Sequence, residues 1–153
     1  MKIRMVCVGK IASAPLKALA EDYRKRLELL CDLEIVEIKD ADDQDGARRL
    51  AREADRIRVV AEPLSECILW DEAGEALGSR EFSAYIDKLE NNSAKRLTMI
   101  IGSSHGVADD LKAAISRKLQ LSKFTLTHEW ARALALEQLY RAHCIKRNLP
   151  YHH

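Results

Sequence analysis

The most constraining feature of the sequence is a run of five β-compatible residues, LTMII at 97–101, that ends abruptly in a loop bracketed by Gly102 and Gly106. Such a run predicts a strand buried on both faces. The two glycines let the chain turn sharply and bring its backbone amides close to a ligand. The spacing lacks the three-glycine dinucleotide fingerprint, and no Gly-Lys-Ser/Thr follows to form a phosphate loop. We therefore expect a strand that feeds a binding loop of another kind.

Elsewhere in the chain, short apolar runs are likewise followed by longer segments in which apolar residues recur with helical spacing. We predict strands over 2–8, 33–38, 67–71, 97–101 and 121–126. We predict helices over 15–31, 47–61, 79–89, 109–118 and 130–146, with a turn at 71–74. Strands that alternate with helices of ten or more residues favour a parallel sheet covered on both faces. The sequence therefore predicts a single α/β domain over residues 1–153.

The last predicted helix is apolar around most of its circumference rather than along one stripe. Its alanines and leucines, together with Tyr140 and Ile145, leave few purely polar positions between Trp130 and Lys146. Such a helix needs more than one apolar neighbour. The second neighbour is either another subunit or, within one chain, a second helix beside the sheet.

Charge is balanced overall but unevenly distributed. The chain has 25 Lys and Arg against 24 Asp and Glu. From residue 112 onward there are eight basic and two acidic side chains, and before it seventeen and twenty-two. A polyanion would therefore bind at the C-terminal quarter. The four cysteines form no Cys-x-x-Cys pair, which favours buried free thiols over a metal site, and the absence of a long apolar run predicts a cytoplasmic protein without a membrane span.

Several short motifs, in this order and over the whole length, resemble one known family. They are LTHEWAR at 126–132, LEQLYRA at 136–142, LPYH at 149–152, the Met-Lys-Ile start, Leu-Trp-Asp at 69–71 and Ile-Gly-x-x-x-Gly at 101–106. The chain resembles the large-subunit ribosomal RNA methyltransferase H group of the SPOUT superfamily. The resemblance implies a trefoil-knotted parallel sheet flanked by helices, and a homodimer whose interface, like the knot, lies in the C-terminal part. It also implies S-adenosylmethionine as cofactor and methylation of N3 of a pseudouridine in 23S ribosomal RNA, in the large subunit or the assembled ribosome.

The resemblance assigns the cofactor contacts to three segments. These residues are Trp70, Gly102, Ser103, Gly106, Ser122, Lys123, Phe124, Thr125, Leu126 and Thr127. Family members often have glycine where this chain has Ser103, and proline where it has Thr127. A side chain at position 103 would disturb the loop if the backbone there had a positive φ.

The resemblance and the basic C-terminal segment together indicate five residues for the reaction: His128, Arg132, Arg141, Tyr151 and His152. Methyl transfer from a sulfonium mainly requires alignment of donor and acceptor, and it requires no metal. The N3 proton of the ring must be lost, which calls for a base or for donors that stabilise the anionic ring. Histidine accepts a proton near neutral pH, and arginine and tyrosine suit phosphate contact and base stacking. We expect the tail to face RNA rather than to support the fold.

Two other functions fit part of the pattern. A non-catalytic RNA-binding α/β module would use the same basic tail without a cofactor. A nucleotide-dependent oxidoreductase would require a glycine fingerprint after the first strand, where the chain has only Val8-Gly9-Lys10.

Overall fold

A five-stranded parallel sheet forms the centre of the protein. In the computed structural model, which describes residues 1–152, the strand order is β2-β1-β4-β3-β5 and every pairing is parallel. The strands are β1 (Lys2–Val8), β2 (Asp32–Ile38), β3 (Cys67–Ala76), β4 (Arg96–Ile101) and β5 (Arg117–Gln120). The helices are α1 (Ala14–Glu28), α2 (Gly46–Ala61), α3 (Ser79–Asn91), α4 (Asp109–Ala114) and α5 (His128–Lys146), with a 3-10 turn at Leu64–Glu66.

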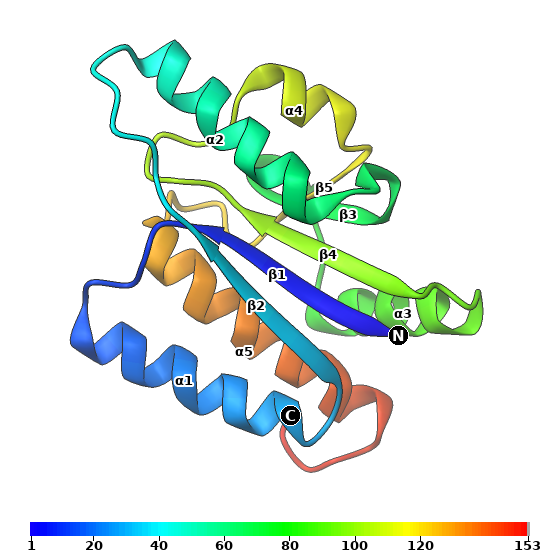
Figure 1. Cartoon of the computed structure of the whole chain (residues 1–153). Helices are drawn as coiled ribbons and strands as arrows, with labels where there is room; N and C mark the ends of the chain where they lie inside the picture. The colour runs from blue at the N-terminus through cyan, green and yellow to red at the C-terminus, as the bar shows by residue number, and fades with distance from the viewer. Residues whose placement is uncertain (153) are drawn as a thin grey trace.

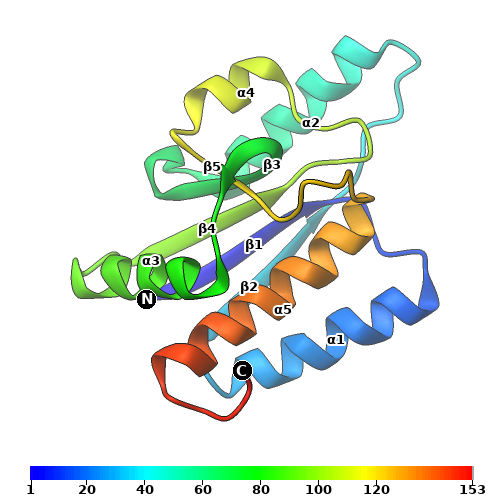
Figure 2. The ribbon, with the colours of Figure 1, turned by 180° about the vertical axis from the view of Figure 1, so that it is seen from behind.

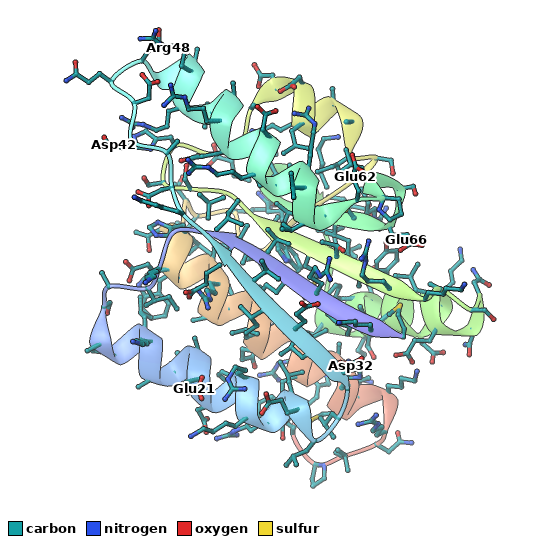
Figure 3. All side chains as sticks on the ribbon, in the orientation of Figure 1. Glu21, Asp32, Asp42, Arg48, Glu62 and Glu66 are labelled. Carbon is teal, nitrogen blue, oxygen red and sulfur yellow. The ribbon has the colours of Figure 1, made fainter. Side chains whose placement is uncertain are left out.

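Helices cover both faces of the sheet, as the alternation predicts. Helices α1, α3 and α5 lie on one face, and α2 and α4 lie on the other (Figure 1). The view from behind shows α5 running beside α1 across the middle strands (Figure 2). Figure 3 shows Asp42 and Arg48 at the outer tip formed by the start of α2 and the loop before it. No helix within residues 1–152 is long and apolar enough to cross a membrane.

Alternation along the central strands divides the core into two layers. Met5 and Met99 belong to the layer under α1, α3 and α5, whereas Val6 and Ile100 belong to the layer under α2 and α4. Side chains of successive strand residues point to opposite faces, so a strand covered on both sides must be apolar throughout. Residues 97–101 are all buried, which confirms the prediction for β4.

The prediction for the third strand is too short. β3 continues to Ala76 through the predicted turn at 71–74, and its register with β5 shifts between Trp70 and Glu75. A Cβ at Gly74 would lie 2.6 Å from the backbone carbon of Leu119. Gly74 is therefore needed because two strands approach closely at a bulge, and not because the chain turns there.

The fifth strand lies earlier than predicted. β5 covers residues 117–120, and α4 ends at Ala114 instead of reaching Lys118. An edge strand with one fully buried residue, Leu119, carries almost no hydrophobic pattern, whereas the apolar residues of 121–126 face a cavity or solvent. The prediction of a strand over 121–126 is therefore wrong: these residues alternate between apolar and polar, but they form a loop.

Helix α5 has two helical neighbours within the same chain. It packs against α1 and α3 and covers part of β4. Ala135, Leu136 and Leu139 are fully buried there, and so is Cys144. The apolar circumference of this helix is thus largely accounted for by a single chain, which corresponds to the second of the two alternatives drawn from its sequence.

Candidate active site

A cavity of about 1020 Å³ opens at the carboxyl end of β4, beside the middle of β3. Its walls come from the middle of β3, the end of β4 and the loop after it, the side chain of Lys112 in α4, the loop after β5, and the starts of α1 and α5. The residues are Ser13, Leu16, Trp70, Asp71, Glu72, Ile101, Gly102, Ser103, Ser104, His105, Gly106, Val107, Lys112, Leu121, Ser122, Phe124, Thr125, Leu126, Thr127, His128, Glu129, Trp130 and Ala131. Ligands of parallel α/β sheets bind at this edge, where the crossing loops leave a crevice.

The loop after β4 folds back on itself within five residues. The amide of Gly106 donates to the carbonyl of Ser103 at 3.0 Å, and Gly106 has a φ of +84°. A Cβ at Gly102 would lie 2.6 Å from the Gly106 carbonyl oxygen, so only glycine fits. Within residues 1–152 the non-glycine residues with positive φ are Ser93 and Asn148. Ser103 therefore has an ordinary backbone conformation, and a side chain is compatible with the loop.

The loop after β5 forms the opposite wall. The Ser122 hydroxyl accepts a hydrogen bond from the Phe124 amide at 2.9 Å, and the Thr125 hydroxyl donates to Glu72 at 3.3 Å. Thr127 caps α5 by accepting from the Trp130 amide at 3.3 Å. Nine of the ten residues expected to contact the cofactor line the cavity, and Lys123 does not.

The middle of β3 contributes an indole and a carboxylate. Trp70 packs edge-on against Phe82 with ring centroids 5.5 Å apart, and its Nε1 is buried without a hydrogen-bond partner in the described chain. Asp71 forms an ion pair with Lys112 at 2.8 Å. Burial acts to raise the pKa of Asp71, but the Lys112 ammonium and the Ala73 amide outweigh it and hold the pKa below its ordinary value.

The start of α5 is tied to the loop before α1. Glu129 accepts hydrogen bonds from the amides of Ala12 and Ser13, at 3.2 and 3.0 Å, and these bonds lower its pKa. His128 also lines the cavity, close to Gly9, where an added Cβ would lie 3.6 Å from His128 Nε2. Sequence reasoning does not reveal the Glu129 contacts, because the partners are more than a hundred residues apart.

Arg132 lies behind this region instead of on the cavity wall. Its guanidinium pairs with Glu37 at 2.5 Å, and its side chain is 11% exposed. Glu37 belongs to β2 and Cys7 to the adjacent β1, so the arginine packs over the ends of two strands. Burial raises the pKa of the Cys7 thiol to about 12, while the nearby guanidinium acts in the opposite direction. Within one chain Arg132 is therefore placed to hold α5 on the sheet.

The other three residues expected for the reaction gather at the far end of α5. The Tyr151 hydroxyl lies 2.9 Å from that of Tyr23 and 3.1 Å from a Glu137 oxygen. The Arg141 guanidinium bonds to Glu137 at 2.5 Å and stacks on the Tyr151 ring at 4.7 Å. His152 Nδ1 lies 3.4 Å from Arg141.

This tail cluster, defined as Tyr23, Glu137, Arg141, Tyr151 and His152, is separated from the cavity. Thirteen residues divide His128 from Arg141, which is roughly 20 Å along a helix. Burial, followed by the hydrogen bond with Tyr23 and the nearby Glu137 carboxylate, raises the pKa of Tyr151. The expectation that the tail does not support the fold is wrong within one chain, since the tail is docked on α1 and α5. That the tail faces RNA stays a prediction.

The titratable side chains of residues 1–152 include no group of three or more His, Cys, Asp or Glu that could hold a metal ion. His153 lies outside the described residues.

Comparison with known proteins places these observations in a family. A family model described as "Predicted SPOUT methyltransferase" matches residues 1–152. Proteins named ribosomal RNA large subunit methyltransferase H are similar over full length: that of Geobacter sulfurreducens is 36% identical with 100% of both chains covered, and that of Gloeobacter violaceus is 36% identical with 100% and 99% covered. The crystal structure of a tRNA (m1G37) methyltransferase from Aquifex aeolicus superposes with a TM-score of 0.54 at 17% identity, over 98% of this chain and 71% of that one. This structural likeness concerns the fold.

Proposed function

Because the chain belongs to the SPOUT methyltransferase family, in the group of ribosomal RNA large subunit methyltransferase H, we propose that it methylates 23S ribosomal RNA of the large subunit at N3 of a pseudouridine, with S-adenosylmethionine as donor. The SPOUT fold class predicted from the sequence is confirmed by the family and by the parallel sheet. The observation that carries the proposal is the cavity itself, whose walls include nine of the ten residues that the resemblance assigns to the cofactor. Such an enzyme would act in the cytoplasm, where the ribosome is.

The cavity fits such a cofactor in size and in the nature of its walls. Small-molecule sites usually enclose about 300–1,000 Å³, and this cavity is at the upper end of that range. The Trp70 indole forms part of one wall, and the Gly102 turn leaves backbone groups uncovered by side chains. Asp71, Glu72 and Glu129 give the walls carboxylates that suit a ligand with a positive charge. When bound, S-adenosylmethionine supplies an electrophilic methyl group on a sulfonium.

The chain's own task is alignment and exclusion of water. The loop over 102–106 is fixed by its glycines and by the Ser103–Gly106 hydrogen bond. The loop over 122–127 is fixed by its internal hydrogen bond and by the Thr125–Glu72 contact. Two preorganised walls hold a donor in place without further ordering on binding, which raises the rate of an in-line displacement.

The proton on N3 has to be held or removed by groups at the cavity mouth. His128 is the one residue of the expected five that lines the cavity in a single chain. Arg141, Tyr151 and His152 carry the remaining donors and acceptors, but they lie about 20 Å away along α5. One chain therefore does not bring the expected groups together.

A twofold dimer would resolve this separation. In a symmetric pair the same surface is used twice, so the tail cluster of one protomer can approach the cavity of its partner. Phe124 and Trp130, at 84% and 52% exposure, form an apolar rim beside the cavity that a second copy would cover. We therefore propose that the dimer interface lies at this rim and along the outer side of α5.

Mass-spectrometric mapping of modified nucleosides tests the reaction. Ribosomal RNA from a strain that lacks the gene should miss one N3-methylpseudouridine in the large subunit, and the restored gene should return it. The purified protein with S-adenosylmethionine should add the same methyl group to particles from the deletion strain. An unchanged nucleoside pattern in both experiments would contradict the proposed reaction.

A further inference from the structure

A buried carboxylate lies behind the loop that closes the cavity. Glu53, on the inner face of α2, is 2% exposed. One of its oxygens accepts a hydrogen bond from the Ala41 amide at 3.0 Å, and the other accepts from the Ser103 hydroxyl at 2.8 Å. Glu53 thus joins two loops that are distant in sequence, one after β2 and one after β4.

The Ser103 side chain carries this connection into the loop itself. Its hydroxyl oxygen accepts from the His105 amide at 3.3 Å, while its carbonyl accepts from the Gly106 amide. Both partners of Ser103 line the cavity. A displacement of the serine hydroxyl would therefore move backbone groups that face the ligand.

The rest of this face of α2 is apolar, which makes the carboxylate informative. Ala54, Ile57 and Ala61 pack into the core layer beneath α2. A buried carboxylate costs free energy unless hydrogen bonds replace its water. Here both replacing donors, an amide and a hydroxyl, are neutral. An apolar side chain could pack at this position without such hydrogen bonds. We therefore take the contacts of Glu53 with Ala41 and Ser103 as the role of this residue.

We propose that Glu53 is a positioning residue for the cofactor loop and acts through the Ser103 hydroxyl. The identity of the ligand rests on the proposed function, whereas the hold on the loop does not. The Ser103 side chain is the working part of the link between Glu53 and the loop, because its hydroxyl donates to the Glu53 carboxylate.

Loss of the link should weaken binding by loosening the loop. When only a fraction of the protein has the competent loop, the apparent Kd rises by the inverse of that fraction. A hydrogen bond to a charged group is strong enough to change that fraction severalfold. We expect Ser103→Ala to raise the Kd for S-adenosylhomocysteine by roughly three- to tenfold, measured by calorimetry.

Ser83→Ala is the matched control. Ser83 is buried, whereas Ser103 is half-buried, and the Ser83 hydroxyl donates to the Ala142 carbonyl at 2.8 Å between α3 and α5, away from the cavity. The two variants lose similar hydrogen bonds, so both should lower the melting temperature. Only Ser103→Ala should raise the Kd and speed amide hydrogen exchange at His105 and Gly106.

Variants of Glu53 distinguish an effect on the position of the 102–106 loop from an effect on the stability of the whole fold. Glu53→Gln keeps an acceptor for the Ala41 amide and gains an N–H for the serine oxygen, so it should bind better than Glu53→Ala. In the Glu53→Ala background, Ser103→Ala should add less than about twofold, because the two residues act as one unit.

The outcomes are distinct. Faster exchange at residues 105 and 106 with a raised Kd supports the proposal. Unchanged exchange in Ser103→Ala overturns it, and so does faster exchange with an unchanged Kd. If the wild-type protein binds no S-adenosylhomocysteine, the proposed function fails, while the exchange measurement still decides whether Glu53 holds the loop.

Discussion

The two ends of α5 differ in how their polar groups are used. At its start, two loops line an open cavity, and hydrogen bonds within the loops and to Glu53 and Glu72 hold them. At its end, Tyr151 and Arg141 are paired with Glu137, and the Tyr151 and Tyr140 rings meet edge to face at 4.8 Å. The first region is arranged to receive a ligand, whereas the polar side chains of the second region already have partners within the chain. A single chain thus separates the cavity from the groups expected to handle the target base, which is why the proposed reaction requires two copies.

Removal of the tail should have the largest effect on the reaction. Deletion of residues 151–153 takes away Tyr151 and His152 and leaves the cavity walls untouched. We expect methylation to fall at least about a hundredfold while the Kd for S-adenosylhomocysteine stays within about twofold, on the scale of tenfold per 1.4 kcal/mol. The melting temperature should also fall, because Tyr151 is docked on α1 and α5. Normal methylation by the folded truncated protein would remove the tail from the mechanism.

A change in the other region should affect binding first. In Gly102→Ala the new Cβ would lie 2.6 Å from the Gly106 carbonyl oxygen and from Val107 Cγ2. Overpacking of this kind costs about 1–3 kcal/mol, so we expect S-adenosylhomocysteine to bind roughly tenfold to a hundredfold more weakly. Gly46→Ala is the control, since nothing lies within 4 Å of its added Cβ. Equal affinity in the two folded variants would contradict the assignment of the loop.

The packed end of α5 should also respond to acid. Burial lowers the pKa of His143 to about 4, whereas an exposed histidine titrates near 6.5. Between these values the unfolded chain binds more protons than the folded one, so the free energy of unfolding falls as the pH falls from about 6.5 to 4. His143→Gln should make the urea midpoint less dependent on pH over this window. An identical pH dependence in wild type and variant would show that His143 titrates freely.

The smallest effect is expected at the cavity's ion pair. Lys112 holds the pKa of Asp71 below its ordinary value despite burial, so the pair stabilises the fold at neutral pH. This contribution is lost as the pH falls through the lowered pKa of Asp71. Lys112→Met should therefore lower the melting temperature at pH 7, and the difference from wild type should shrink in strong acid. A difference that is constant with pH would assign the effect to packing alone.

The sequence predicts the parts of the fold whose burial leaves a periodic pattern. β1, β2 and β4 and the helices α1, α2, α3 and α5 lie where predicted to within a few residues at their ends. β5 could not be predicted, because an edge strand with one buried residue has no hydrophobic periodicity. The bulge at Gly74 could not be predicted either, because a glycine at a close approach and a glycine in a turn look alike in sequence.

Residues of the candidate site could be predicted only where they belong to a sequence motif shared with the resembled family. The walls at Trp70, 102–106 and 122–127 follow from the resemblance, and the cavity brings them together. The contacts of Glu53 with Ser103 and of Glu129 with the Ser13 amide join residues 50 and 116 positions apart. Neither partner is unusual in its local sequence, so only the folded chain reveals them.

Mixing two impaired variants, at an S-adenosylmethionine concentration well below the Kd of Gly102→Ala, tests most directly whether the cavity of one protomer works with the tail of its partner. Gly102→Ala keeps its tail, and the variant lacking residues 151–153 keeps its cavity. After the mixture is unfolded and refolded together, about half of the symmetric dimers should contain one chain of each kind, and each of these has one complete site. We predict that methylation of large-subunit RNA recovers to about a quarter of the wild-type rate. A mixture that contains mixed dimers but stays inactive would contradict the account.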